Sequence, residues 1–129
     1  MTKHGKKIVV VDDDIWLARQ FAHNLEQHVV GCQVAVASNG LEAIDLIEEF
    51  GADVIVLDVF MPGPNGIVLL HELQSHSDLA KIPVILCSNS VSTMSISAER
   101  LRGYGVQRVI DKGTMVPDDL ITGVRRVLA

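Results

Sequence analysis

Five short runs of aliphatic, mostly β-branched residues recur along the chain, and a longer segment of helical period follows each of them. The strands that these runs predict cover residues 8–11, 33–36, 54–57, 84–87 and 108–110; the second begins with Gln33 and the fifth with Arg108. Parallel strands that are buried on both faces read as continuous apolar runs, and helices connect them. The alternation therefore predicts an α/β fold, a doubly wound (βα)5 unit around a five-stranded parallel sheet.

The expected helices differ in how clearly the sequence marks them. Asn39 is a suitable N-cap for a helix over 41–50, because its side chain can accept from a free backbone N–H. Pro117 suits the first position of the last helix, where no N–H is required. The helix over 96–102 is marked least clearly. It begins within a Ser-rich stretch over 88–97, whose side chains compete for backbone hydrogen bonds.

The length and composition restrict the class of protein. A chain of 129 residues predicts a single domain over 1–129, with its core from about residue 6. Its unbroken apolar runs reach four residues, whereas a helix needs about 20 to cross a bilayer, so we expect no membrane span and a cytoplasmic location.

Cys32 and Cys87 lack metal-ligand spacing and are expected to be buried thiols. The net charge of −5 disfavours direct nucleic-acid binding.

Polar residues follow four of the apolar runs, at the point where each predicted strand ends. They are Asp12, Asp13 and Asp14 after the first, Asp58 after the third, Ser88 and Asn89 after the fourth, and Asp111 and Lys112 after the fifth. The carboxyl ends of parallel strands meet at one edge of the sheet, which is where such folds bind ligands. The sequence therefore predicts one polar site at this edge.

The residue types indicate the chemistry of this site. Asp12, Asp13 and Asp58 would supply oxygen ligands without any His or Cys, a donor set that suits Mg²⁺ or Mn²⁺. Lys112 would add a mobile positive charge and Ser88 a hydroxyl donor. Together these groups could hold a phosphoryl group on a carboxylate.

These motifs resemble those of the receiver domain of two-component response regulators, over residues 6–129. The matching residues are Asp12, Asp13 and Asp14 after the first strand, Asp58 with Met61, Pro62 and Gly63 and with Asn65 and Gly66, Pro83 followed by Ser88, and Lys112. The resemblance implies a flavodoxin-like strand order of 2-1-3-4-5.

The resemblance also implies a role for each site residue. Asp58 corresponds to the phosphoacceptor and Asp13 to the direct Mg²⁺ ligand, with Asp12 as its partner, acting through water or by supporting the direct ligand. The backbone carbonyl of Phe60 is a further expected metal ligand. Ser88 corresponds to the switch hydroxyl and Lys112 to the phosphate-binding cation.

The implied partners are proteins. A histidine kinase or a phosphotransfer protein would donate the phosphoryl group, and a downstream protein would bind the face of the fourth helix, fifth strand and fifth helix. Such a domain is a switch rather than an enzyme, although it assists its own phosphorylation and slow dephosphorylation. Val109 and Gly113 stand where many members have an aromatic residue and Pro, so the output mechanism is expected to differ.

Three other functions are compatible with an aspartate-rich α/β domain, and the sequence disfavours two of them. A phosphatase would need a second acid two residues after Asp58, where this chain has Phe60. A flavodoxin-like nucleotide binder would need a small-residue phosphate cradle in place of the three aspartates. A protein-interaction module that has the receiver fold but is not phosphorylated stays open, because of Val109 and Gly113.

Overall fold

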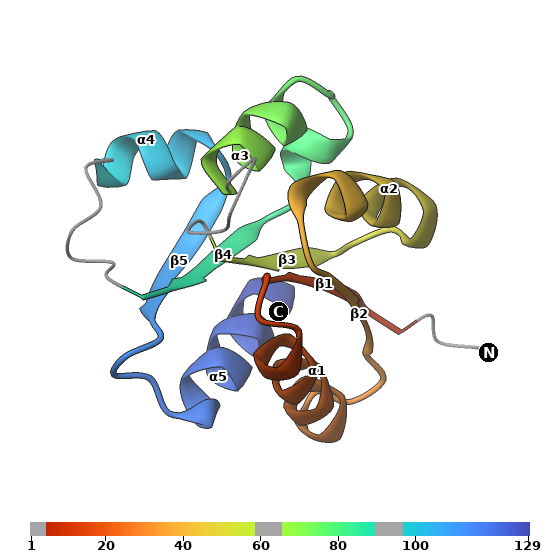
Figure 1. The fold of residues 1–129 in the computed structure, drawn as a ribbon, viewed down its shortest axis with the longest axis vertical. Coiled ribbons are helices and arrows are strands. Elements are labelled where there is room, and N and C mark those ends of the chain that lie inside the picture. Colours follow the sequence, from red (N-terminus) through yellow and green to blue (C-terminus); the bar gives the residue numbers. More distant parts are fainter. Residues whose placement is uncertain (1–4, 59–65, 90–96) are drawn as a thin grey trace.

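The structure is a computed structural model that describes residues 5–58, 66–89 and 97–129 (Figure 1). Strands and helices alternate along the chain, as the sequence predicts. In order they are β1 (Lys7–Val11), α1 (Ile15–His28), β2 (Gln33–Ala37), α2 (Gly40–Phe50), β3 (Val54–Leu57), α3 (Gly66–Gln74), the 3₁₀ turn η1 (Leu79–Lys81), β4 (Val84–Ser88), α4 (Ala98–Gly103), β5 (Val106–Asp111) and α5 (Pro117–Leu128).

The five strands form one parallel sheet in the order β2-β1-β3-β4-β5, which confirms the predicted order. Helices α1 and α5 cover one face, and α2, α3 and α4 cover the other (Figure 1). Successive strand residues point to opposite faces, so Ile8 and Val10 pack with α1 and α5, whereas Val9 and Val11 pack with the other three helices. This double burial explains why the strands read as continuous apolar runs.

Three helix boundaries have clear local causes. The Asp14 side chain accepts a hydrogen bond from Leu17 N at 3.1 Å at the start of α1. The Asn39 side chain accepts from Glu42 N at 2.9 Å at the start of α2, as predicted. Gly51 ends α2 with φ of 84°, a conformation that favours glycine.

The largest differences from the predicted boundaries lie in β5 and α4. Strand β5 covers six residues rather than the predicted three, because Val106 pairs with Val84 ahead of a register shift. Helix α4 begins at Ala98, since the Ser97 side chain accepts from Arg100 N at 3.2 Å and caps it there. The Ser-rich segment over 90–96 lies outside the described residues.

The predicted burial of the two cysteines is confirmed for one of them only. Cys87 is buried as expected, whereas Cys32 is only half-buried. Within the described part of the chain, no helix is long and apolar enough to cross a membrane.

Candidate functional site

The ends of β1 and β3 place two aspartates side by side. Val11 pairs with Leu57 in the sheet, and the ladder continues for one more residue on each strand. Asp12 N donates to Ala37 O at 3.0 Å, and Asp58 N donates to Val11 O at 3.0 Å. The backbone of both aspartates is therefore fixed by the sheet rather than by a loop.

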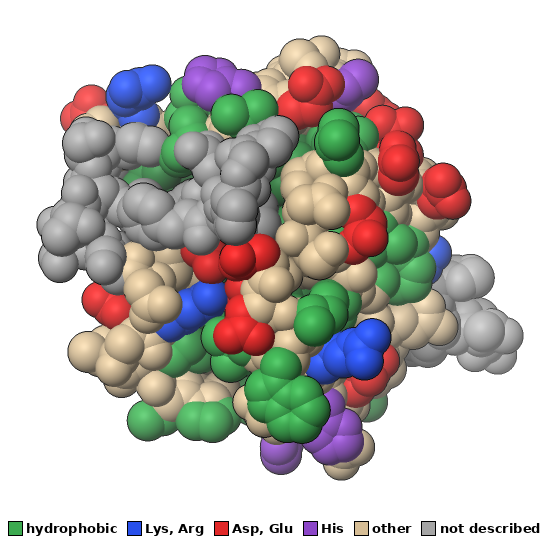
Figure 2. Space-filling model, viewed as in Figure 1, with side chains coloured by type: hydrophobic (Ala, Val, Ile, Leu, Met, Phe, Trp, Pro, Cys, Tyr) green, Lys and Arg blue, Asp and Glu red, His purple; other side chains and the backbone are tan. Residues whose placement is uncertain are grey.

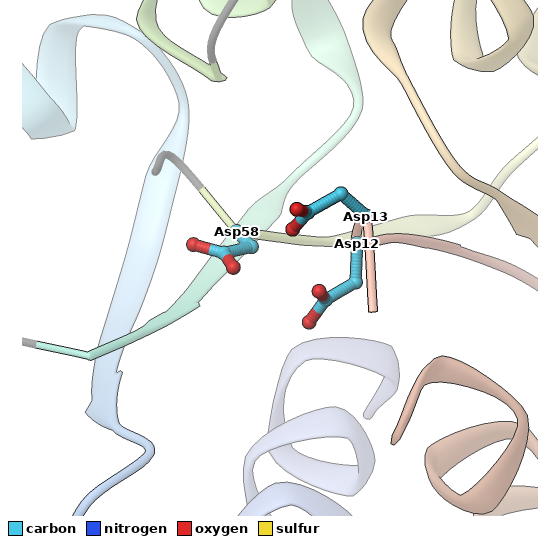
Figure 3. A group of neighbouring side chains, drawn as sticks. All are labelled: Asp12, Asp13 and Asp58. Atoms are coloured by element: carbon cyan, nitrogen blue, oxygen red, sulfur yellow. The ribbon is translucent and has the colours of Figure 1, made fainter. Parts of the chain in front are cut away.

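Asp12, Asp13 and Asp58 form an acidic cluster at this edge (Figure 3). One carboxylate oxygen from each lies within 4.8 Å of those of the other two. Asp12 and Asp58 are 2% and 6% exposed, whereas Asp13 is exposed. The cluster therefore combines two buried carboxylates with one on the solvent side.

Lys112 joins the two buried carboxylates. Its Nζ lies 2.5 Å from Asp12 Oδ2 and 2.8 Å from Asp58 Oδ2, and its side chain is 8% exposed. The backbone of this loop is also held, since Lys112 N donates to Ser88 O at 3.1 Å. The ammonium thus offsets part of the repulsion between Asp12 and Asp58.

Ser88 completes the surroundings of Asp58. This serine is fully buried at the end of β4, and its Oγ donates to Asp58 Oδ1 at 2.7 Å. Lys112 binds the other oxygen, so both oxygens of the Asp58 carboxylate have a donor from a different strand end. Five residues that the sequence singled out therefore meet: Asp12, Asp13, Asp58, Ser88 and Lys112.

Burial and charge act in opposite directions on the pKa values of this site. Burial raises the pKa of Asp12, although the hydrogen bonds from Lys112 and from Asp14 N oppose the rise. Burial alone would lower the pKa of Lys112, but the carboxylates of Asp12 and Asp58 raise it above its ordinary value. Lys112 is therefore a full positive charge at neutral pH.

The acidic cluster fits a small divalent cation. Its three carboxylates carry a formal charge that exceeds the charge of Lys112 by two, which a divalent ion would balance. The ligand atoms are all hard oxygens, and the exposed side at Asp13 leaves room for the waters that Mg²⁺ retains. Phe60, the fourth predicted ligand, lies outside the described residues.

Sequence reasoning missed two contacts around the site. Asp14, whose side chain caps α1, also donates its backbone N–H to Asp12 Oδ1 at 2.9 Å. Cys87 lies beneath the site with its Sγ 3.5 Å from Met115 Sδ, and burial raises the pKa of this thiol to about 12. Neither contact has a signal in the spacing of the sequence, because both depend on side-chain and loop conformation.

Comparison with known proteins gives one consistent result. The family model of the response regulator receiver domain matches residues 8–125. The chain is 31% identical over 125 residues to the "Probable transcriptional regulator ycf29" of Pyropia yezoensis, of which it covers 53%. It is also 30% identical over 112 residues to the polar-differentiation response regulator DivK of Brucella anthropi, of which it covers 88%. The chain thus spans about half the length of the ycf29 proteins of two algae, at 53% and 56%.

Solved structures agree with this match. The receiver domain of the Francisella response regulator 1452 is 31% identical, with a TM-score of 0.77, and the match covers 96% of this chain and 97% of that one. The chemotaxis protein CheY4 of Vibrio cholerae is 25% identical, with a TM-score of 0.80, and the match covers 96% and 99% of the two chains.

Proposed function

The chain belongs to the response regulator receiver domain family of two-component signalling, and from this premise we propose that Asp58 accepts a phosphoryl group in the presence of Mg²⁺. The donor is the phosphohistidine of a histidine kinase or of a phosphotransfer protein. One observation carries the proposal: the Asp58 carboxylate lies between the Lys112 ammonium and the Ser88 hydroxyl, beside two further carboxylates. A structural aspartate does not require this arrangement.

Asp12, Asp13 and Asp58 would hold the metal ion, together with the backbone carbonyl of Phe60. Asp13, which is exposed, would be the direct ligand, and Asp12, which is buried, would act through water or by supporting the direct ligand. When bound, Mg²⁺ neutralises charge on the phosphoryl oxygens and orients them for in-line transfer. Mn²⁺ has the same preference for oxygen ligands and would serve in its place.

The chemical step uses two groups of this chain that already contact Asp58, the Lys112 ammonium and the Ser88 hydroxyl. An oxygen of Asp58 attacks phosphorus, the new oxygen–phosphorus bond forms, and the bond between phosphorus and the donor's histidine nitrogen breaks. Lys112 then moves its ammonium from the carboxylates to a phosphoryl oxygen, and Ser88 turns its hydroxyl to another. The chain therefore works as a switch that assists its own phosphorylation and slow dephosphorylation, not as an enzyme with a separate substrate.

The signal leaves through the face made by α4, β5 and α5, where a downstream protein binds. Ser88 is the last residue of β4 and pairs with Asp111 of β5, so a movement at the phosphoryl group reaches β5 directly. Val109, 40% exposed on β5, cannot swing an aromatic ring, so the change on this face is small. We also place this function in the cytoplasm, without direct contact with nucleic acid.

Incubation with acetyl phosphate and Mg²⁺, followed by intact mass measurement, tests the proposal. The wild-type chain should gain the mass of one phosphoryl group, and Asp58→Asn should gain none. Asp78→Asn is the matched control, because Asp78 is exposed and its side chain caps no backbone N–H. A wild-type mass that stays unchanged would favour the alternative, a receiver-fold interaction module that acts without phosphorylation.

A further inference from the structure

Helices α2 and α3 carry all of the chain's excess negative charge. They contain no Lys or Arg, and they hold five exposed acidic residues, which are Glu42, Asp45, Glu48, Glu49 and Glu72. The rest of the chain has 11 acidic and 11 basic residues, so it is neutral when His is neutral. Figure 2 shows acidic side chains gathered over this part of the molecule, with hydrophobic side chains among them.

An apolar groove of about 420 Å³ lies between these two helices. Its lining combines the apolar residues Leu41, Ile44, Val68 and Leu69 with the acidic residues Asp45 and Glu72. Leu41 is 77% exposed and Val68 is 52% exposed. Two large apolar side chains thus face solvent on opposite sides of the same groove.

Leu41 and Val68 are not required for the core beneath them. Helix α2 buries Ala43 and Ile47 against the sheet, and α3 buries Leu69, Leu70 and Leu73. Exposed apolar residues that cluster, rather than lie scattered, mark an interaction site. Leu41, Ile44, Asp45 and Glu48 follow helical spacing, so the apolar and acidic groups share one side of α2.

We propose that this groove, the α2–α3 groove, binds a basic amphipathic helix of a partner protein. The apolar side chains of that helix would lie against Leu41 and Val68, and its flanking Lys or Arg would pair with Asp45 and Glu72. Charge complementarity selects this occupant. A second copy of the chain would bring two acidic rims together, and an anionic membrane or a nucleic acid would be repelled.

This surface is separate from the phosphoryl-transfer site and from the α4–β5–α5 face. None of its lining residues belongs to the acidic cluster or to the three elements of that face. The α2–α3 groove would therefore let the chain bind a second protein while its output face is occupied. The inference does not require Asp58 to be phosphorylated.

A synthetic amphipathic peptide, with Leu on one face and Lys on the other, is the direct probe. Titrated into the isotope-labelled full chain, it should shift amide signals mainly in α2 and α3. The same peptide with Glu in place of Lys should bind at least tenfold more weakly. Shifts centred on α1 or on α4, β5 and α5 would overturn the proposal, and so would the absence of any shift.

Variants of the chain separate the apolar and charged parts of the proposal. Leu41→Ser with Val68→Ser should weaken peptide binding about tenfold, because the two largest exposed apolar side chains that line the groove are then lost. Val30→Ser is the matched control, since Val30 is fully exposed elsewhere, and it should bind like wild type. Asp45→Asn with Glu72→Gln should weaken binding and reduce its salt dependence.

All of these substitutions lie at exposed positions, so equal melting temperatures are expected and would show that the fold is intact. Unchanged affinity in both double variants would refute the α2–α3 groove as the binding site. Sedimentation that showed dimers of wild type, but not of the Leu41 and Val68 variant, would assign the groove to a second copy of the chain and overturn the proposal.

Discussion

Replacing Lys112 with Met removes the one charge that joins the two buried carboxylates. The ammonium lies 2.5 Å from Asp12 Oδ2 and 2.8 Å from Asp58 Oδ2, and the side chain is 8% exposed. Met keeps a similar chain length without the charge. Removing one partner from a buried ion pair costs about 3–5 kcal/mol, because the remaining charge stays buried without compensation.

Repulsion between the Asp12 and Asp58 carboxylates predicts a loss of unfolding free energy of similar size. Two unit charges 4 Å apart repel by about 4 kcal/mol at an effective dielectric constant of 20. We therefore expect Lys112→Met to lose about 3–5 kcal/mol of unfolding free energy in the presence of EDTA. Urea unfolding followed by circular dichroism measures this loss.

The same variant should respond more strongly to Mg²⁺ than wild type does. Lys112 and the metal compete for the same oxygens of Asp12 and Asp58, so the variant should bind Mg²⁺ more tightly and recover most of the lost stability. Val30→Ser, at a fully exposed position after α1 and outside the acidic cluster, serves as a control that should show the wild-type response to Mg²⁺. A loss of equal size with and without saturating Mg²⁺ would refute this reasoning.

Lys112 also makes the stability of the fold depend on pH, and its raised pKa gives the direction of that dependence. Its pKa is raised in the folded state, so the folded protein holds this proton more tightly than the unfolded chain does. The stabilisation is fully present below the ordinary pKa of 10.5 and is lost as the pH rises through the higher folded value. Lys112→Met should remove this alkaline loss of stability from the urea curves.

Three further predictions concern metal binding, dephosphorylation and thiol reactivity. Mg²⁺ at about 100 times its dissociation constant should add about 2.7 kcal/mol of stability. Asp13→Asn should abolish that gain in a melting experiment; equal melting temperatures of wild type with and without Mg²⁺ would contradict it. Phe60→Asn should speed loss of phosphate, because an amide side chain can hydrogen-bond and orient an attacking water, which a phenyl ring cannot do; an unchanged decay rate would rule out side-chain control there. Cys87, with its pKa raised to about 12, should resist iodoacetamide in the native protein and react in urea, and equal rates in both would contradict its burial.

The positions of the site residues along the chain could be predicted because the sheet is buried on both faces. Continuous apolar runs locate the strand ends within a residue or two, and a parallel sheet brings those ends to one edge. Asp12, Asp58 and Ser88 could therefore be placed at the site without any knowledge of side-chain conformation. Their backbone groups are part of the ladder, or one residue beyond it.

The contacts between these side chains could not be predicted in the same way. The Lys112 side chain has four rotatable bonds, so the position of its ammonium depends on the folded loop. Only the structure shows that this ammonium bridges Asp12 and Asp58. The extra length of β5 depends on a register shift against Val84, which leaves no local pattern. Likewise, only the position of α3 shows that Leu41 borders an open groove.

Mapping the phosphorylated residue tests the central claim most directly. Borohydride reduces an aspartyl phosphate to homoserine, which marks the modified position for peptide mass spectrometry. After treatment with acetyl phosphate and Mg²⁺, we expect homoserine at position 58 alone, and none without Mg²⁺ or in Asp58→Asn. Homoserine at position 12 or 13, or an unmodified position 58 after full exposure to the donor, would contradict the assignment of Asp58 as the phosphoacceptor.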